Sequence, residues 1–273
     1  MPRSDKAQIA VDMYGALWNR FQWDKSDAWK GIAHLLLTCQ IWDRSWRPFH
    51  DVVVYREVNS FRMLNRGPNA ALQKAESLSG YLAHLLGLPR QQLCQEIGLY
   101  WEDPRTAALQ PHNLVGHAYR SLTVDILERF GDPGIRYVEE VDPYDEFPGH
   151  DFQGLSEHPK IDIVARRGNK TVALISSRWR YRHDRVGVVD EAHAYIGAAR
   201  RQYSGCQFIA SVGEFDAARL GKVLENCPPE SPHGPLAATV HFQPRLVTEG
   251  LGTNGRTHSL QDFEWLIDQT FLW

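Results

Sequence analysis

Hydrophobic residues recur at helical spacing through the first hundred residues of the chain. The apolar positions of the first such stretch are Ile9, Met13, Leu17 and Phe21. Similar stretches follow at about residues 29–36, 72–85 and 91–100. The segment 102–105, Glu-Asp-Pro-Arg, then interrupts the pattern. These aliphatic stripes indicate packed helices, and we predict an N-terminal α-helical domain over residues 1–108.

From residue 109 onward, helical stretches alternate with short runs of strand composition. Helices are expected at 113–130, 186–202, 214–226 and 259–271, and strands at 135–141, 160–166, 171–179, 206–212 and 237–243. The strands on either side of Gly168 and Asn169 form a predicted hairpin. An antiparallel hairpin followed by strand–helix–strand units implies a mixed β-sheet flanked by helices, so we predict an α/β domain over residues 109–273.

The register of this hairpin decides which charged side chains share a face. Ser176 and Arg178 lie on one face of the second strand because side chains alternate. Asp162 joins them if it lies opposite Ser176, a register that a three-residue loop at 168–170 provides and a two-residue loop does not. Lys160 then lies opposite Arg178, which is unfavourable unless an anion such as a phosphate lies between them. The alternative is a solvated hairpin whose charges keep a sheet edge soluble.

Composition excludes several classes of protein. The 273 residues are 43% hydrophobic and 23% charged, which is ordinary for a soluble globular chain. No apolar run approaches the roughly 18 residues of a membrane span, and the polar start MPRSDKAQ does not resemble a signal peptide, so we expect a cytoplasmic protein. No P-loop, dinucleotide-binding or HExxH motif is present. The net charge is −3, yet residues 160–185 hold eight basic and two acidic side chains, a cluster typical of nucleic-acid contacts.

Residues 176–185 read Ser-Ser-Arg-Trp-Arg-Tyr-Arg-His-Asp-Arg, and an acidic pair follows at Asp190 and Glu191. With Asp162 on the preceding strand, this pattern resembles type II restriction endonucleases of the PD-(D/E)XK superfamily. The branch most similar to it cuts sites with a CCGG core. That branch has an Asp, a hairpin, Ser-x-Lys, then Arg-x-Asp-Arg and a displaced glutamate on the next helix. The likeness spans about residues 110–212 and is sharp over about thirty of them.

The resemblance implies roles for the residues of the hairpin and the following helix. Asp162 is expected to bridge a Mg²⁺ ion and the scissile phosphate. Ser176 stands where most relatives of this superfamily have an acidic residue, and Glu191 is expected to take over that role and complete the coordination of Mg²⁺. Asp190 is the alternative if the phase of the helix turns Glu191 away from the site.

Two further positions are left open by the resemblance. Related enzymes place an acid on an earlier helix, for which Asp125 is the better candidate and Glu128 the next; a solvated helix face explains both equally well. The position of the catalytic lysine holds Arg178, which keeps the charge but is bulkier and cannot give up a proton near neutral pH. Cleavage could be preserved, slowed or lost, and Lys160 is a second candidate for the cation.

The arginine-rich segment suits the edges of a CCGG core. Arg182 and Arg185 are each expected to bond bidentately to a guanine, and Asp184 to accept hydrogen bonds from cytosine amino groups. Arg180 and His183 are expected to contact DNA beside them, His183 through a phosphate or only as a spacer. The alternative is an exposed, salt-bridged start of a helix.

Together, these patterns predict a type II site-specific deoxyribonuclease. We expect Mg²⁺-dependent hydrolysis of double-stranded DNA at a palindrome with a CCGG core, leaving 5′-phosphate ends, with residues 109–273 as the catalytic domain. A palindrome implies two sites related by a twofold axis, hence at least a homodimer, and the N-terminal domain is expected to contact DNA or assist dimerisation. The alternative is a sequence-specific DNA-binding protein of the same fold with weakened or lost cleavage. A repair or junction nuclease that shares only the hairpin is a third reading, which the Arg-x-Asp-Arg pattern disfavours.

Overall fold

The computed structural model divides the chain into two compact units, Pro2–Leu122 and Thr123–Trp273. It describes residues 5–35, separate positions between 80 and 95, and residues 111–152, 159–179, 187–214, 217–225, 234–244, 247–248 and 260–273. The domain boundary expected at 108/109 lies outside the described residues. Helix α6 (Pro111–Phe130) spans the division between the units. No helix of the described part is both long and apolar enough to cross a membrane.

In the first unit, helix α1 (Asp5–Phe21) carries the predicted apolar stripe. Tyr14 and Leu17 are buried, and the Tyr14 hydroxyl donates to the backbone oxygen of Ala28 at 3.2 Å. Gly31 lies against the Tyr14 ring, where an added Cβ would come within 2.2 Å of a ring carbon. Residues 29–35 are helical from Trp29, as predicted, whereas most of the helices expected at 72–85 and 91–100 lie outside the described residues.

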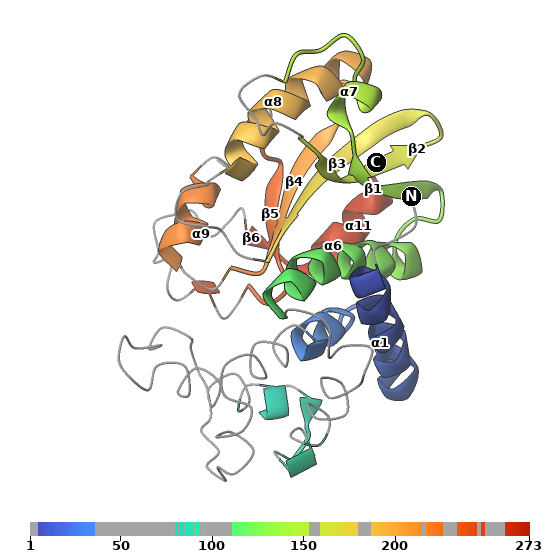
Figure 1. Ribbon diagram of the computed structural model, residues 1–273, viewed down its shortest axis with the longest axis vertical. Helices are drawn as coiled ribbons and strands as arrows, with labels where there is room; N and C mark the ends of the chain where they lie inside the picture. Colours follow the sequence, from blue (N-terminus) through green and yellow to red (C-terminus); the bar gives the residue numbers. More distant parts are fainter. Residues whose placement is uncertain are drawn as a thin grey trace. The chain divides into compact units, whose positions relative to one another are not determined.

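The second unit is built on one six-stranded sheet in the order β1-β2-β3-β4-β5-β6 (Figure 1). The strands are β1 (Ile135–Val141), β2 (Ile161–Arg167), β3 (Lys170–Arg178), β4 (Gln207–Val212), β5 (Ala238–His241) and β6 (Leu260–Gln261). The first three strands pair antiparallel, and the remaining pairs are parallel. The predicted α/β class with a mixed sheet is therefore confirmed.

Helices flank this sheet on both faces. They are α7 (Pro143–Glu146), α8 (Gly187–Gln202), α9 (Ala217–Leu224) and α11 (Phe263–Thr270), with the end of α6 beside α11 (Figure 1). The backbone nitrogen of Asp132, just after α6, donates to Thr270 Oγ1 in α11 at 2.8 Å. Helix α7 and strand β6, which have four and two residues, are too short to give a periodic pattern and are not predicted. Strand β6 lies within the helix predicted at 259–271, so the start of that prediction was wrong and the helix begins at Phe263.

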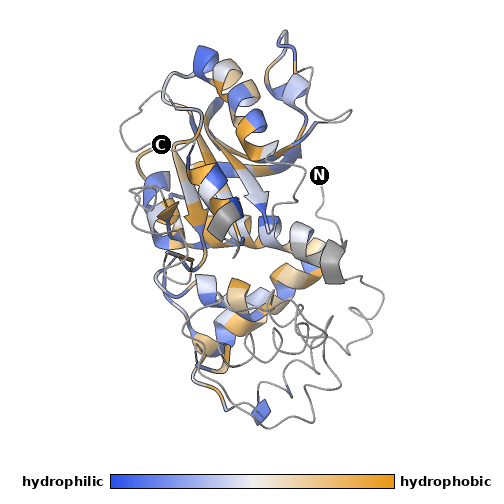
Figure 2. Ribbon diagram, turned by 90° about the vertical axis from the view of Figure 1, so that its left-hand side faces the viewer, coloured by the Kyte–Doolittle hydropathy of each residue, from blue (hydrophilic) through white to orange (hydrophobic). Residues whose placement is uncertain are grey.

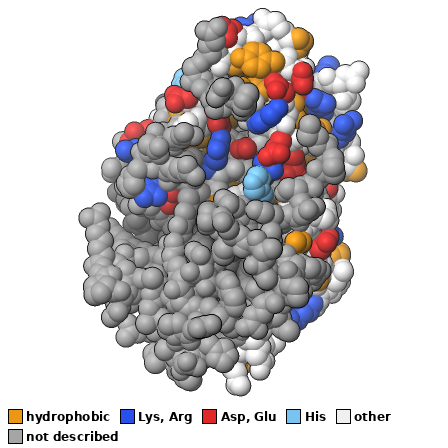
Figure 3. Space-filling view, viewed as in Figure 1, with side chains coloured by type: hydrophobic (Ala, Val, Ile, Leu, Met, Phe, Trp, Pro, Cys, Tyr) orange, Lys and Arg blue, Asp and Glu red, His pale blue; other side chains and the backbone are white. Residues whose placement is uncertain are grey.

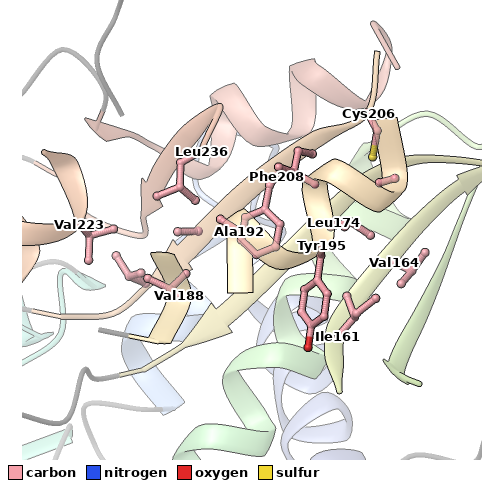
Figure 4. Close-up of a cluster of buried hydrophobic side chains, with 14 of the residues drawn as sticks. Ile161, Val164, Leu174, Val188, Ala192, Tyr195, Cys206, Phe208, Val223 and Leu236 are labelled. Atoms are coloured by element: carbon pink, nitrogen blue, oxygen red, sulfur yellow. The ribbon is translucent and has the colours of Figure 1, made fainter. Parts of the chain in front are cut away.

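The core beside α8 uses alternate residues of the central strands. Val164, Leu174 and Phe208 pack there with buried side chains of α8 and α9 (Figure 4). Their neighbours along the strands, such as Ile163 and Ile175, are also buried and point to the opposite face. The strands of the sheet are accordingly hydrophobic along most of their length (Figure 2). Side chains that continue the Val164 and Leu174 rows toward the strand ends therefore lie on the α8 face.

The hairpin between β2 and β3 reaches the predicted register by an unexpected route. Arg167 pairs with Lys170 across a two-residue loop in which Gly168 has a φ of 60°, not across the predicted three-residue loop. A β-bulge between Ala165 and Arg166 then shifts the pairing by one residue, so that Ala165 lies opposite Ala173. The loop prediction was wrong, but the bulge compensates for it. Beyond the bulge, the register is the one that sets Asp162 against Ser176.

Candidate active site

The ends of β2 and β3 bring Asp162, Ser176 and Arg178 together on the α8 face. Oδ2 of Asp162 accepts a hydrogen bond from the backbone nitrogen of Ser177 at 2.8 Å and lies 3.4 Å from the Ser176 hydroxyl. Arg178 Nε lies 3.6 Å from the same carboxylate oxygen. The side chains of Ser176 and Arg178 share a face because one residue separates them on the strand. The carboxyl group and the guanidinium thus converge, as the even register requires.

Helix α8 adds Glu191 to this group. The helix turns Val188, Ala192 and Ile196 onto the sheet, and this phase carries Glu191 to the site while Asp190 stays exposed. Glu191 Oε2 accepts from the Ser176 hydroxyl at 3.1 Å. Of the two acidic residues weighed from the sequence, Glu191 is therefore the one that lies with Asp162.

Arg178 joins the two carboxylates. One terminal nitrogen of its guanidinium donates to Glu191 Oε1 at 2.5 Å, and its Nε lies 3.5 Å from the Ser176 hydroxyl. The Arg178 side chain is 41% exposed, against 16% for Asp162 and 18% for Glu191. The two acids are thus largely buried, and the Arg178 guanidinium lies between them and solvent. A cation in this position can meet an anion that approaches from outside.

The environment of Glu191 disfavours its charged form. Burial raises the pKa of its carboxyl from an ordinary 4.5 to about 7, with the Asp162 carboxylate adding to the effect and the Arg178 guanidinium opposing it. Two acids that share one cation carry an excess of negative charge when both are ionised. The site is therefore electrostatically suited to a further positive charge.

The donor set fits a magnesium ion. Both carboxylates reach one hydroxyl, that of Ser176, so a single ion between them could bind both. Oδ1 of Asp162 takes no hydrogen bond from any described residue and remains available. Mg²⁺ characteristically takes one or two carboxylates and completes its shell with water and substrate oxygens. Within the described residues, no third His, Cys, Asp or Glu side chain joins this pair to form a cluster that could hold a metal ion.

The acids considered on the earlier helix lie apart from this pair. Asp125 is buried and forms an ion pair with Arg129 one turn later on α6, at 2.6 Å. Glu128 is exposed. The structure does not bring either carboxylate into contact with Asp162 or Glu191, so a part for them in the chemistry stays a prediction.

Lys160, the second candidate for the cation, is held by a different acid. Its Nζ lies 2.9 Å from Oδ2 of Asp142, the residue that caps the N-terminus of α7. The Asp142 carboxylate also accepts from the backbone nitrogen of Tyr144 at 3.0 Å. This arrangement ties Lys160 to α7, whereas Arg178 is the cation that bonds to the Asp162–Glu191 pair.

The residues expected to read bases are Arg180, Arg182, His183, Asp184 and Arg185, and all five lie outside the described residues. The described chain ends one position before them, at Trp179, and resumes at Gly187. On the face shown in Figure 3, Lys and Arg side chains lie among Asp and Glu side chains, so both charges are present over the sheet unit. The assignment of base contacts stays a prediction.

Comparisons with known proteins give one likeness to report. No protein-family model and no curated protein matches the chain. The chain is similar to a solved structure, that of the restriction endonuclease PspGI in complex with substrate DNA, at 14% sequence identity and a TM-score of 0.35. The match covers 75% of this chain and 77% of that chain. A likeness of this size carries no argument about activity.

Proposed function

We propose that this protein is a metal-dependent endonuclease that hydrolyses double-stranded DNA. The observation that carries the proposal is the convergence of Asp162 and Glu191 on one hydroxyl, with Arg178 at the opening of the same site. Two acids and a cation where β2, β3 and α8 meet supply what phosphodiester hydrolysis needs: anchors for a divalent cation and a positive charge for the phosphate. The sequence resemblance to PD-(D/E)XK endonucleases supports the same assignment.

Each residue of the site has a distinct part in this proposal. Asp162 and Glu191 would hold Mg²⁺, with water and a phosphate oxygen filling the other positions. The bound ion would lower the pKa of a water molecule and stabilise the charge that builds on the phosphate. Arg178 would leave Glu191 to donate to the phosphate, since a metal takes over the neutralisation of that carboxylate. Ser176 would orient Glu191 by donating its hydroxyl hydrogen, and the Ser177 N–H would fix Asp162.

The bond that breaks lies between phosphorus and the 3′-oxygen. A water molecule adds to the phosphorus, the 3′-oxygen leaves and takes a proton, and the products are a 5′-phosphate and a 3′-hydroxyl. Arginine cannot act as the base for this water near neutral pH. We therefore assign Arg178 to charge stabilisation alone.

The expected target is a palindrome with a CCGG core, cut by a homodimer. Support for the core comes from Arg182, Asp184 and Arg185, whose side chains match the donor and acceptor pattern of guanine and cytosine in the major groove. Support for the dimer comes from symmetry, because two identical half-sites call for two identical readers.

A DNA-binding protein that no longer cuts is the second candidate. The observation that favours it is the closed ion pair of Arg178 with Glu191, which already neutralises one acid without any metal. In that case the site would hold DNA through Arg178 and the arginine-rich segment, and Mg²⁺ would have no effect on the DNA.

Digestion of genomic DNA with sequencing of the fragment ends separates these proposals. We expect discrete fragments in the presence of Mg²⁺, a CCGG core at every cut site when the two ends are read together, and a phosphate on each 5′ terminus. Ends of random sequence would reject site-specific cleavage. DNA that is shifted in a gel yet stays intact with Mg²⁺ and with Mn²⁺ would support the binding protein instead.

A further inference from the structure

Tyr195 is a buried phenol one turn after Glu191 on α8. Residues four apart lie on the same face of a helix, so Tyr195 follows Glu191 toward the sheet. Its ring packs edge-on against Phe152, with centroids 5.4 Å apart and an interplanar angle of 65°, and only 2% of the residue is exposed. Figure 4 shows the ring between α8 and the sheet, with the side chain of Ile161, the residue next to Asp162, beside it.

The hydroxyl of this tyrosine has no acceptor in the described part of the chain. It forms no hydrogen bond with any described residue, although a buried phenol normally finds a partner. It is also absent from the fully buried polar atoms that lack a partner, so the small exposed area of Tyr195 includes its oxygen. The hydroxyl therefore offers a free donor at the boundary between the core and the site.

Burial, together with the charges around Tyr195, keeps that donor protonated. Burial raises the pKa of the phenol well above its usual range, and the Glu191, Asp162 and Asp142 carboxylates add to the effect, while Arg178 opposes it. A neutral O–H next to several acids can donate a hydrogen bond to an incoming anion without adding a charge to the site. The Phe152 contact holds the ring in place, so little side-chain freedom is lost when the bond forms.

We propose that the Tyr195 hydroxyl donates a hydrogen bond to a nonbridging oxygen of the scissile phosphate. The inference rests on the proposed nuclease function. A phosphate that binds Arg178 and a metal ion held by Asp162 and Glu191 would bring its nonbridging oxygens to the part of α8 where Tyr195 lies one turn after Glu191. Tyr195 then donates to the phosphate from the buried side of the site, and Arg178 donates from the exposed side.

The matched test compares Tyr195→Phe with Tyr203→Phe. Phenylalanine keeps the ring and its packing against Phe152 and removes only the hydroxyl. Tyr203 follows the other end of α8, where its ring lies under Lys170 at 5.7 Å, so it serves as a control for the loss of a tyrosine hydroxyl. Three quantities are measured for each protein: the melting temperature, the affinity for a cognate duplex in Ca²⁺, and the single-turnover cleavage rate in Mg²⁺.

We expect Tyr195→Phe to bind the duplex within about twofold of wild type and to cut it roughly 10-fold or more slowly, as the loss of a hydrogen bond to a charged oxygen predicts. Tyr203→Phe should cut at the wild-type rate. Replacing the contacted oxygen with sulfur, as one phosphorothioate diastereomer, should slow wild type and leave Tyr195→Phe little changed, so that the difference between the two proteins shrinks. A change in folding alone would not produce this dependence on one oxygen.

The outcomes separate the two proposals. Wild type that cleaves no DNA with Mg²⁺ or Mn²⁺ rejects the nuclease function and this role together. Wild type that cleaves, with Tyr195→Phe equally fast, rejects the role of Tyr195 alone. The same rejection follows if Tyr195→Phe loses rate, affinity and melting temperature together while both diastereomers slow it as much as they slow wild type.

Discussion

Replacing Glu191 with glutamine should make the protein more stable at alkaline pH, in the absence of metal. The Glu191 carboxyl has a pKa of about 7 in the folded protein, because burial disfavours its charge, against 4.5 when exposed. Below pH 4.5 it is protonated in both states and has no effect on stability. Between pH 4.5 and 7 the unfolded chain releases this proton before the folded protein does, so the free energy of unfolding falls. Above pH 7 the carboxyl is ionised in both states, and the free energy of unfolding falls no further through this group.

The size of the effect follows from the difference between the two pKa values. A difference of one pKa unit corresponds to about 1.4 kcal/mol, so Glu191 should cost about 3 kcal/mol at pH 8 relative to pH 4. Glutamine has nearly the same shape and no charge, which makes it a close copy of the protonated acid. The difference in unfolding free energy between Glu191→Gln and wild type should therefore grow by about 3 kcal/mol from pH 4 to pH 8.

Urea denaturation in EDTA at several pH values measures this difference. Asp190→Asn is the matched control, because Asp190 is the preceding residue of α8 and is exposed. Its difference from wild type should stay within about 0.5 kcal/mol across the same range. If the curves of Glu191→Gln and wild type run parallel from pH 4 to pH 8, burial does not control the ionisation of Glu191 and the reasoning is refuted.

Three further predictions concern packing, acid stability and base recognition. Gly213→Ala places a Cβ 2.2 Å from a carbon of the Trp179 indole, so it should lower the unfolding free energy measured in urea by about 1–3 kcal/mol. The control is Gly197→Ala, which has nothing within 4 Å of the added Cβ and should cause no such loss. Equal losses in the two variants would contradict the packing argument. Burial lowers the pKa of His241 to about 4, so the contribution of His241 to stability should fall by about 3 kcal/mol as pH drops from 6.5 to 4. His241→Asn cannot titrate, so the difference in unfolding free energy between it and wild type should change by about that amount over this range in the same assay. Replacing Arg182 or Arg185 should cost roughly 1–3 kcal/mol of cognate binding free energy and relax sequence discrimination in a binding titration, and unchanged discrimination would remove the base-reading assignment.

The pairing of Asp162 with Ser176 could be predicted from the sequence, but the path to it could not. The alternation of apolar residues determines which side chains enter the core, and this sets Val164 against Leu174. The loop follows a local preference instead, for glycine at positive φ in a two-residue turn. A bulge at Ala165/Arg166 allows the two-residue turn and the register of the core residues to occur in the same hairpin. No local sequence signal distinguishes a bulge from a longer loop, so only the structure decides.

On α8, the helical period alone determines which acid enters the site. Val188, Ala192 and Ile196 mark the buried face, and that phase turns Glu191 inward and leaves Asp190 exposed. Tyr195 was not predicted as a site residue, because a tyrosine within a buried apolar stripe resembles any other core residue. Its spacing of four from Glu191 was the available signal. The ion pair of Arg178 with Glu191 depends on the distance between a strand end and a helix, which no spacing along the chain provides.

Cleavage of supercoiled plasmid that carries CCGG sites tests the central claim most directly. Wild type and the Asp190→Asn control should linearise or fragment the DNA in Mg²⁺ and leave it intact in EDTA. Asp162→Asn removes the negative charge at the meeting point of β2, β3 and α8, so it should abolish cleavage while DNA binding in Ca²⁺ survives. Cleavage by Asp162→Asn at the wild-type rate would show that the phosphate is not attacked at this site, and the account would be wrong.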